Sequence, residues 1–449
     1  MPGLIGEDRF RAVAAAALDL QGVDGVEVLY THEWGGLTRF ANSVIHQSTF
    51  REDTGLRVRV VSRNRTGVAS SNDFTERGAR EAAASAKEMA EVAAPDPLFP
   101  GIAPKADVPG VDRFFEATAD MTPASRAEAV EQLIDRCPPG FVAAGAFETS
   151  AAELGIANSE GQFCYSPGTL ASLTTVMTGG EHGSGFAETF SGSAEFVDPV
   201  ALGTHAADKA VRSQRPVALD PGTYPVVLEP AAVATLAGFL AYMGFGGRGY
   251  IEDRSCFSGK AGQRVAAESI SIWDDGADPR TLGAAFDFEG VPRRRVELIK
   301  DGVFLDAVYD LRTGKQSGRP STGHGLPAPN PEGPFPLNLF MEEGDASLED
   351  MINSTHRGVL VTRFHYSNIV NPIESSITGM TRDGTFLIER GEIVGPVMNF
   401  RFTQSIIDAL TSVSLVGRKA ELASEFFFSA SRVPALKVEE FHFSGRSDH

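Results

Sequence analysis

The feature that most constrains the fold is a stretch without charge between Glu229 and Arg248, in the sequence YPVVLEPAAVATLAGFLAYMGFGGRG at residues 224–249. A short apolar strand is followed by Pro230, which favours the first turn of a helix, and residues 231–245 are apolar on nearly every side. A helix that is apolar all round must be buried, either in a protein core or in a membrane. Glycines interrupt the stretch, and its helical part is shorter than the roughly 20 residues of a membrane crossing. The sequence therefore predicts a buried core helix and no membrane association.

The chain of 449 residues is too long for one ordinary hydrophobic core, so we expect two domains. Turn-forming residues around Pro216 and Pro221 mark the boundary, which divides the chain into domains 1–215 and 216–449. The second domain is richer in strand-like patterns than the first. The predicted class is α+β, with an N-terminal mixed α/β-sheet domain followed by a strand-rich, barrel-like domain around the buried helix.

In the N-terminal domain, apolar periodicity and turn residues predict four helices and several strands. The helices are expected at residues 9–20, 73–93, 123–136 and 199–211, and the strands at 25–31, 38–47, 55–62, 66–70 and within 140–178. Asp73 is a good N-cap for the second helix, and Glu76 three residues later completes a capping box. Asn64 is expected in the turn between the third and fourth strands.

Two segments of the C-terminal domain share one hairpin pattern. LIKDGVFL at residues 298–305 and LIERGEIV at residues 387–394 each place a polar residue and a glycine between apolar runs. They are either two related hairpins of one barrel-like sheet or a common hairpin used twice. Between them, residues 314–336 are rich in proline, and loops of this length are usually functional or disordered. The apolar run at residues 426–428 is most simply a buried strand.

Composition and charge exclude several classes of function. With 40 Lys and Arg against 59 Asp and Glu, the formal net charge is −19, which would repel a phosphate backbone, so we expect no nucleic acid partner. The three cysteines are far apart and form no CxxC pair, which suits a reducing compartment. The N-terminal sequence has acids where a signal peptide would have a basic region. We therefore expect a cytoplasmic protein.

Several local motifs resemble functional sites but have simpler interpretations. Residues 244–249 fit GxGxxG, yet they follow a helix instead of opening one, so a helix exit is favoured over nucleotide binding. His32 and Glu33 form an HE dipeptide, but the sequence Trp-Gly-Gly at residues 34–36 would end any helix, and we expect a turn at a strand end. His182 lies between glycines and is expected in a surface turn.

Two loop histidines remain as candidates for chemistry. His324 lies in STGHG within the proline-rich loop, and His365 follows an apolar strand at residues 358–362. With a carboxylate such as Glu374 they could form a metal site, which needs about three protein ligands. They are far apart in the sequence, and no helical spacing holds them together. Positions that line a substrate cavity and ordinary hydrogen-bonded loop positions are the alternatives.

The strand and helix of residues 224–249 resemble the core of the TldD/PmbA family, some of whose members have been called modulators of DNA gyrase. Six further segments resemble segments of the family and follow one another in the same order as in its members. They are GGLTRFANSVIHQ, GLRVRVV, EGVPRRRVELIKDGVFLDAVYDLRTGKQSG, STGHG, LEDMINSTHRGVLVT and GTFLIERGEIVGPV. In TldD-type members the helix carries HExxxH, whose histidines bind zinc while the glutamate handles the proton of the attacking water, and a cysteine near the C-terminus is the third ligand. The matching positions here are GFLAYM, Gly238 to Met243, and a position near Ala420. They offer no imidazole, thiolate or carboxylate for zinc. The sequence departs from better-known PmbA-like chains at residues 365–384.

The resemblance implies a non-catalytic, PmbA-like (TldE-type) subunit of a heterodimeric zinc metallopeptidase that acts on small or unfolded peptides. Its partner would be a TldD-like, HExxxH-bearing homologue that holds the zinc. This chain would hold no metal, no cofactor and no catalytic residue, and alone it could form a homodimer. The predicted substrate-binding residues are His324, His365, Tyr366 and Asn368. Two alternatives stay open, namely an independent hydrolase that uses a different site in the same cavity, and a scaffold that binds peptide or a small molecule.

Overall fold

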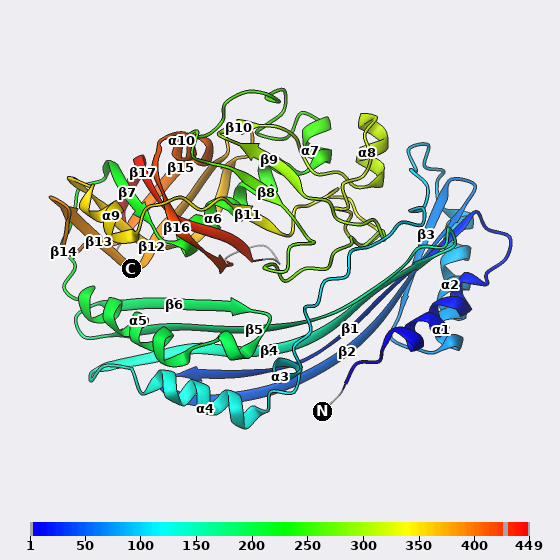
Figure 1. The fold of residues 1–449 in the computed structure, drawn as a ribbon, viewed down its shortest axis with the longest axis horizontal. Coiled ribbons are helices and arrows are strands. Elements are labelled where there is room, and N and C mark those ends of the chain that lie inside the picture. Colours follow the sequence, from blue (N-terminus) through cyan, green and yellow to red (C-terminus); the bar gives the residue numbers. More distant parts are fainter. Residues whose placement is uncertain (1–2, 425–429, 448–449) are drawn as a thin grey trace.

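The computed structural model describes residues 3–424 and 430–447, which form two sheets stacked in one body (Figure 1). The first sheet has six strands in the order β3-β2-β1-β4-β5-β6, and the second has eleven. Helices accompany both sheets, so the predicted α+β class is confirmed. The domain division at residue 215 stays a prediction, and the run at residues 426–428 lies outside the described residues. In the described part of the chain, no helix combines the length and apolar content that a membrane crossing requires.

The first sheet is built from long antiparallel strands. Its strands are β1 (Gly25–Ala41), β2 (Val44–Ser62), β3 (Arg65–Ser71), β4 (Phe141–Asn158), β5 (Phe163–Gly179) and β6 (Gly183–Ser191). Its helices are α1 (Glu7–Leu18), α2 (Glu76–Val92), α3 (Glu116–Ala119), α4 (Pro123–Ile134) and α5 (Pro199–Arg212), with a 3-10 turn at Ala194–Phe196. α1 and α2 bury apolar residues against one end of the sheet, and α4 and α5 do so at the other end. The second sheet lies over the opposite face (Figure 1).

Strand β1 shows that the predicted turn at residues 34–36 is wrong. β1 runs without a break through that segment and pairs with both β2 and β4, so residues 25–31 and 38–41 belong to one strand. The predicted strand 38–47 is interrupted by a turn at residues 42–43, and residues 44–47 belong to β2. A Cβ at Gly35 would lie 2.7 Å from the carbonyl oxygen of Thr149, and one at Gly36 would lie 1.9 Å from a guanidinium nitrogen of Arg126. The glycines therefore allow neighbouring groups to approach the strand, and they do not end it. His32 is buried within β1, and its Nδ1 lies 2.9 Å from the Thr54 hydroxyl.

The start of α2 also differs from the prediction. Its N-cap is Thr75, whose hydroxyl accepts a hydrogen bond from the Gly78 amide at 3.1 Å, so the capping box expected at Asp73 is wrong. The segment before the helix is anchored by Phe74, whose ring stacks on Tyr30 at 4.4 Å between centroids. The other three predicted helices match α1, α4 and α5 to within about two residues, the usual uncertainty of helix ends.

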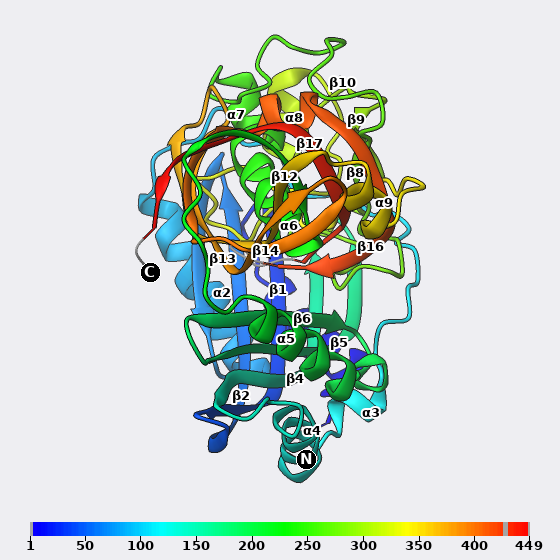
Figure 2. The ribbon, with the colours of Figure 1, turned by 90° about the vertical axis from the view of Figure 1, so that its left-hand side faces the viewer.

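Five strands of the second sheet close into a ring around α6. β7 pairs with both β12 and β17, and the pairs β12-β13, β13-β15 and β15-β17 complete the circle. Figure 2 shows α6 (Pro230–Leu240) within this ring. Nearly all α6 side chains are buried with apolar residues of the surrounding strands. The uncharged stretch is therefore a core helix, as predicted.

The second half contains the five ring strands, further strands beside them and several short helices. Its strands are β7 (Gly222–Leu228), β8 (Ile272–Asp274), β9 (Val296–Lys300), β10 (Val303–Phe304), β11 (Leu339–Met341), β12 (Arg357–Asn371), β13 (Ser376–Glu389), β14 (Glu392–Pro396), β15 (Phe400–Ser405), β16 (Val413–Ala423) and β17 (Ser431–Arg446). Its other helices are α7 (Gly247–Ile251), α8 (Leu311–Ser317), α9 (Leu348–Asn353) and α10 (Ile406–Thr411). Both predicted hairpins are present, as β9-β10 and β13-β14, and they belong to the same sheet.

Candidate functional site

The positions at which the resemblance predicts the zinc motif lie where α6 changes its hydrogen-bonding pattern. Residues Ala241–Phe245 continue α6 as a π-helical turn. Hydrogen bonds in such a turn join residues five apart, which brings side chains at positions i and i+5 toward the same side of the helix. Gly238 and Met243 have this separation. Gly238 lies in α6 before the π turn, and Met243 lies within the turn.

The side chains at these positions do not fit zinc. Gly238 has no side chain, Met243 is 4% exposed within the apolar core, and Ala420 on β16 is 3% exposed. Zinc sites in proteins are made by imidazole, thiolate and carboxylate groups. Within residues 3–424 and 430–447, no three His, Cys, Asp or Glu side chains gather in a group that could hold a metal ion.

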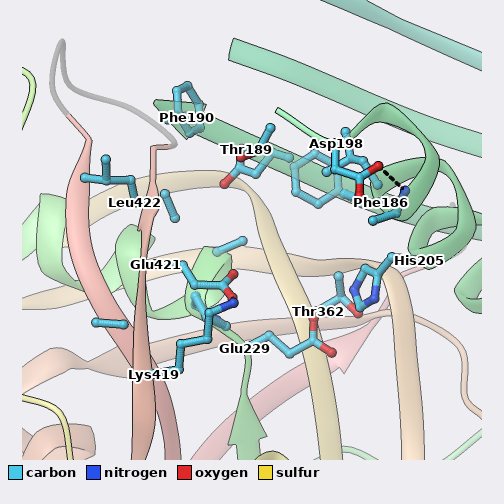
Figure 3. A pocket seen from close by; sticks show the side chains of 18 of the residues that line it. Phe186, Thr189, Phe190, Asp198, His205, Glu229, Thr362, Lys419, Glu421 and Leu422 are labelled. Atoms are coloured by element: carbon cyan, nitrogen blue, oxygen red, sulfur yellow. Dashed lines mark hydrogen bonds and ion pairs between the residues drawn. The ribbon is translucent and has the colours of Figure 1, made fainter. Parts of the chain in front are cut away.

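A cavity of about 700 Å³ lies beside the start of α6, between the two sheets. One wall is formed by β6 and α5 of the first half, and the other by β12, β16 and the first turn of α6 (Figure 3). Ala420, near the position expected for the third zinc ligand, lines this cavity, whereas Gly238 and Met243 do not. The charged and polar residues that line it include Glu188, Asp198, His205, Lys209, Glu229, Thr362, Lys419, Glu421 and Arg432.

A buried ion pair joins the two halves of the molecule at this cavity. Lys209 lies in the last turn of α5, and its ammonium contacts the carboxylate of Glu229, the N-cap residue of α6. The side chains are 7% and 11% exposed. A cation at a helix C-terminus and an anion at a helix N-terminus are each favoured by the helix dipole. The pair therefore fixes the end of α5 against the start of α6.

Glu188 on β6 also lines the cavity but, unlike Glu229, forms no ion pair within the described residues. Burial raises the pKa of its carboxyl group to about 7; nearby Arg363 and a main-chain hydrogen bond from Ser424 lower the pKa, and Glu421 raises it. Burial also lowers the pKa of His205 in the same cavity, and Lys209 adds to that effect. Glu188 therefore changes its charge near neutral pH.

The raised pKa of Glu188 makes stability depend on pH. The folded state favours the protonated carboxyl, so the favourable contribution is present below the ordinary pKa of 4.5 and is lost as the pH rises through about 7. We expect Glu188→Gln to unfold at the same denaturant concentration as the wild type near pH 4.5 and to be more stable by up to about 3 kcal/mol at pH 8. Urea unfolding at both pH values measures this difference.

Glu421→Gln is the matched control, because it removes an acid of the same cavity whose side chain is 49% exposed and already pairs with Lys419. This variant should show no comparable gain at pH 8. Equal stability of Glu188→Gln and wild type at pH 8 would contradict the assignment of a near-neutral pKa to Glu188.

The structure separates the four residues predicted to bind substrate. His324 is completely buried: its Nε2 lies 2.8 Å from Asp274 Oδ1, and its Nδ1 lies 2.9 Å from the Thr322 hydroxyl. His365, Tyr366 and Asn368 lie together on β12, where Tyr366 is 72% exposed with a φ of 51°. Burial and two neighbouring arginines lower the pKa of His365. The three β12 residues form one surface group, and His324 is not part of it. Their role in substrate binding stays a prediction.

The sequence did not identify Glu188 or Lys209 as residues of the site, and it did not predict the ion pair between Lys209 and Glu229. A weak signal was present in each case. Glu188 stands between Phe186 and Phe190 at the spacing of one strand face, and Lys209 interrupts the alanine-rich buried side of α5. His182 was correctly predicted in an exposed turn, between β5 and β6.

Comparison with known proteins agrees with this architecture. The PmbA/TldA metallopeptidase C-terminal domain matches residues 221–445, domain 1 of that family matches residues 26–90, and its central domain matches residues 109–214. The chain is 25% identical over 437 residues to a metalloprotease TldD homolog of Haemophilus influenzae, across 90% of this chain and 89% of the relative. It is 24% identical over 434 residues to the metalloprotease PmbA of Escherichia coli O157:H7, across 92% of each. The crystal structure of TldE from Thermococcus kodakarensis superposes with a TM-score of 0.88 at 22% identity, across 98% of this chain and 99% of that one. The chain therefore belongs to the TldD/PmbA family of metallopeptidases.

Proposed function

We propose that this chain is a non-catalytic subunit of a TldD-type zinc metallopeptidase, and that it shapes the peptide-binding cavity beside a catalytic homologue that bears HExxxH. The observation that carries the proposal is the contrast at α6. The core helix, its π turn and the adjoining cavity are present, while Gly238, Met243 and Ala420 provide no zinc donor. A chain that keeps the fold of the family but lacks the zinc ligands suits a structural subunit of the peptidase.

The cavity is suited to an extended peptide. Five consecutive residues of β6, from Phe186 to Phe190, line it, and β6 is the last strand in the order of its sheet. Main-chain groups along such an edge can pair with an added strand, which gives affinity with little dependence on side chains. This mode fits small or unfolded peptides. His365, Tyr366 and Asn368 would act as further contacts on the surface of β12.

The buried position of His324 disfavours an independent hydrolase. Catalysis by this histidine would require a nucleophile and a substrate within hydrogen-bond reach of its ring. Both ring nitrogens already have partners, in Asp274 and Thr322, and the side chain is 0% exposed. The Asp274 carboxylate also accepts a hydrogen bond from the Asn338 amide at 2.6 Å, so the group is part of a buried structural network.

The proposal predicts that the chain forms a heterodimer with an HExxxH-bearing homologue and that only the mixture is a competent peptidase. Related chains commonly pair through related surfaces, so we expect a pseudo-twofold interface larger than roughly 1,000 Å². Size-exclusion chromatography with light scattering on each chain and on the mixture gives the assembly, and peptide cleavage by each peak gives the activity.

A glutamate-to-glutamine change in the partner's HExxxH motif is the control, since it should abolish cleavage without preventing assembly. If this chain forms only its own dimer in the presence of the partner, and the partner cleaves equally well without it, the subunit assignment is wrong. In that case a peptide-binding or ligand-binding scaffold becomes the better account.

A further inference from the structure

The cavity between β6 and β16 contains an acid without an ion-pair partner. The cations that line the cavity each have a carboxylate within 4.0 Å: Lys209 with Glu229, Lys419 with Glu421, and Arg432 with Glu343. Glu188 forms no ion pair with any residue in the described ranges, and its carboxylate accepts a main-chain hydrogen bond from Ser424. A partly buried carboxylate without an ion-pair partner costs stability, so its position in a cavity points to a ligand that compensates the charge.

The neighbours of Glu188 define the shape of such a ligand. Alternate residues of a strand face the same side, so Phe186, Glu188 and Phe190 form one row on β6. Phe186 lies beneath Arg363, whose guanidinium carbon is 4.1 Å from the ring centroid, so this row already accommodates a cation. Phe196, which is 74% exposed, also lines the cavity. Aromatic rings beside one carboxylate suit an aliphatic chain that ends in a positive charge.

We propose that Glu188 binds a cationic group of a bound peptide, with the adjoining aliphatic part against Phe190 and Phe196. The cation is the side chain of a lysine or arginine, or the peptide's amino terminus. The inference rests on the proposed function, because it assumes that this cavity takes a peptide. Strand addition recognises only the main chain of the peptide, and Glu188 would add a preference for a positive charge.

The same geometry predicts a dependence on pH. Arg363 on β12 and Glu421 on β16 act directly on the charge of Glu188. The other titratable and charged residues that line the cavity are Asp198, His205, Lys209, Glu229, Lys419 and Arg432. The pKa of Glu188 is about 7, so most chains carry its proton at pH 6 and most have lost it at pH 8. A cation binds the ionised carboxylate, so its affinity should rise across this range. Burial lowers the pKa of His205, and Lys209 adds to that effect, so this ring favours its neutral form.

The test uses fluorescein-labelled heptapeptides, Gly-Gly-Ala-X-Ala-Gly-Gly, blocked at both ends, in which X is lysine, norleucine or glutamate. Their dissociation constants with the full chain are measured by fluorescence anisotropy at pH 6 and pH 8. A charge-assisted hydrogen bond should make the lysine peptide about tenfold tighter than the norleucine peptide at pH 8. The preference should shrink to about twofold at pH 6, because the carboxylate is then mostly protonated. A norleucine peptide with a free amino terminus, labelled at its C-terminal end, shows whether the terminal amine is an alternative source of the cation.

Two variants locate the effect. Glu188→Gln should bind the lysine and norleucine peptides alike at both pH values. Glu421→Gln should keep the preference for lysine at pH 8, and its preference at pH 6 should exceed that of the wild type, because Glu421 raises the pKa of Glu188. Equal binding of the lysine, norleucine and glutamate peptides to the wild type would overturn this inference and leave the proposed peptide-binding role intact. If no peptide binds the wild type, the peptide-binding role itself fails, and the inference fails with it.

Discussion

Elemental analysis of the chain, purified without a metal-binding tag, should find far less than one zinc per chain, and the chain alone should cleave no peptide. The resemblance to TldD-type members implies that Gly238 and Met243 replace their zinc-binding histidines and that Ala420 lies near the position of their cysteine ligand. A metal-bound hydroxide is the nucleophile of such peptidases, and enzymes accelerate their reactions by about 10⁶-fold or more. Loss of the ligands should therefore remove activity entirely.

An HExxxH-bearing homologue prepared in the same way is the positive control. It should retain about one zinc per chain, and a chelator should remove its activity. The measurement on the present chain uses fluorogenic peptides across independent preparations, with and without chelator. Tightly held zinc at about one per chain would contradict the prediction. Turnover that survives chelators and disappears on mutation of His365 would favour an independent hydrolase.

The sequence predicted those elements whose residue pattern depends only on neighbouring residues in the chain. The uncharged stretch identified α6 as a core helix because a helix with apolar groups on all sides can be stable only when buried. Helical periodicity located α1, α4 and α5, because each of these helices buries one apolar side against the first sheet. The glycines at positions 35 and 36 misled the prediction, because their role depends on Thr149 and Arg126, which lie more than 80 residues further along the chain. A glycine that ends a strand and one that admits a close neighbour have the same sequence signature.

The candidate site was less predictable than the fold. His324 was predicted to bind substrate because histidine in a loop beside glycines is a common functional residue. In the structure it is a buried structural residue whose Nε2 contacts Asp274. Glu188 lies in a regular strand and acquires its properties from burial against the second half of the chain. Such a site becomes visible only when it is known which faces of the two sheets meet.

The buried ion pair at the cavity should contribute measurably to joining the two halves. We expect Lys209→Met to destabilise the protein by about 3 kcal/mol, because it leaves the carboxylate of Glu229 buried without a cation. This value is at the lower end of the usual range, since the N-terminus of α6 still favours a negative charge there. Urea unfolding, followed by fluorescence and circular dichroism to detect separate transitions of the two halves, gives the change in free energy.

Lys419→Met is the matched control, because it removes a lysine of the same cavity whose side chain is 78% exposed and pairs with Glu421 at 2.7 Å. Exposed pairs contribute about 0–1 kcal/mol, so this variant should unfold nearly like the wild type. The double variant Lys209→Met with Glu229→Gln should recover part of the lost stability, since no unpaired charge then remains, and the cycle of single and double variants isolates the coupling energy. If Lys209→Met and Lys419→Met cost the same, the Lys209–Glu229 pair does not hold α5 to α6, and other contacts between the two halves, such as that of Ser184 with Asp383, must position the walls of the cavity.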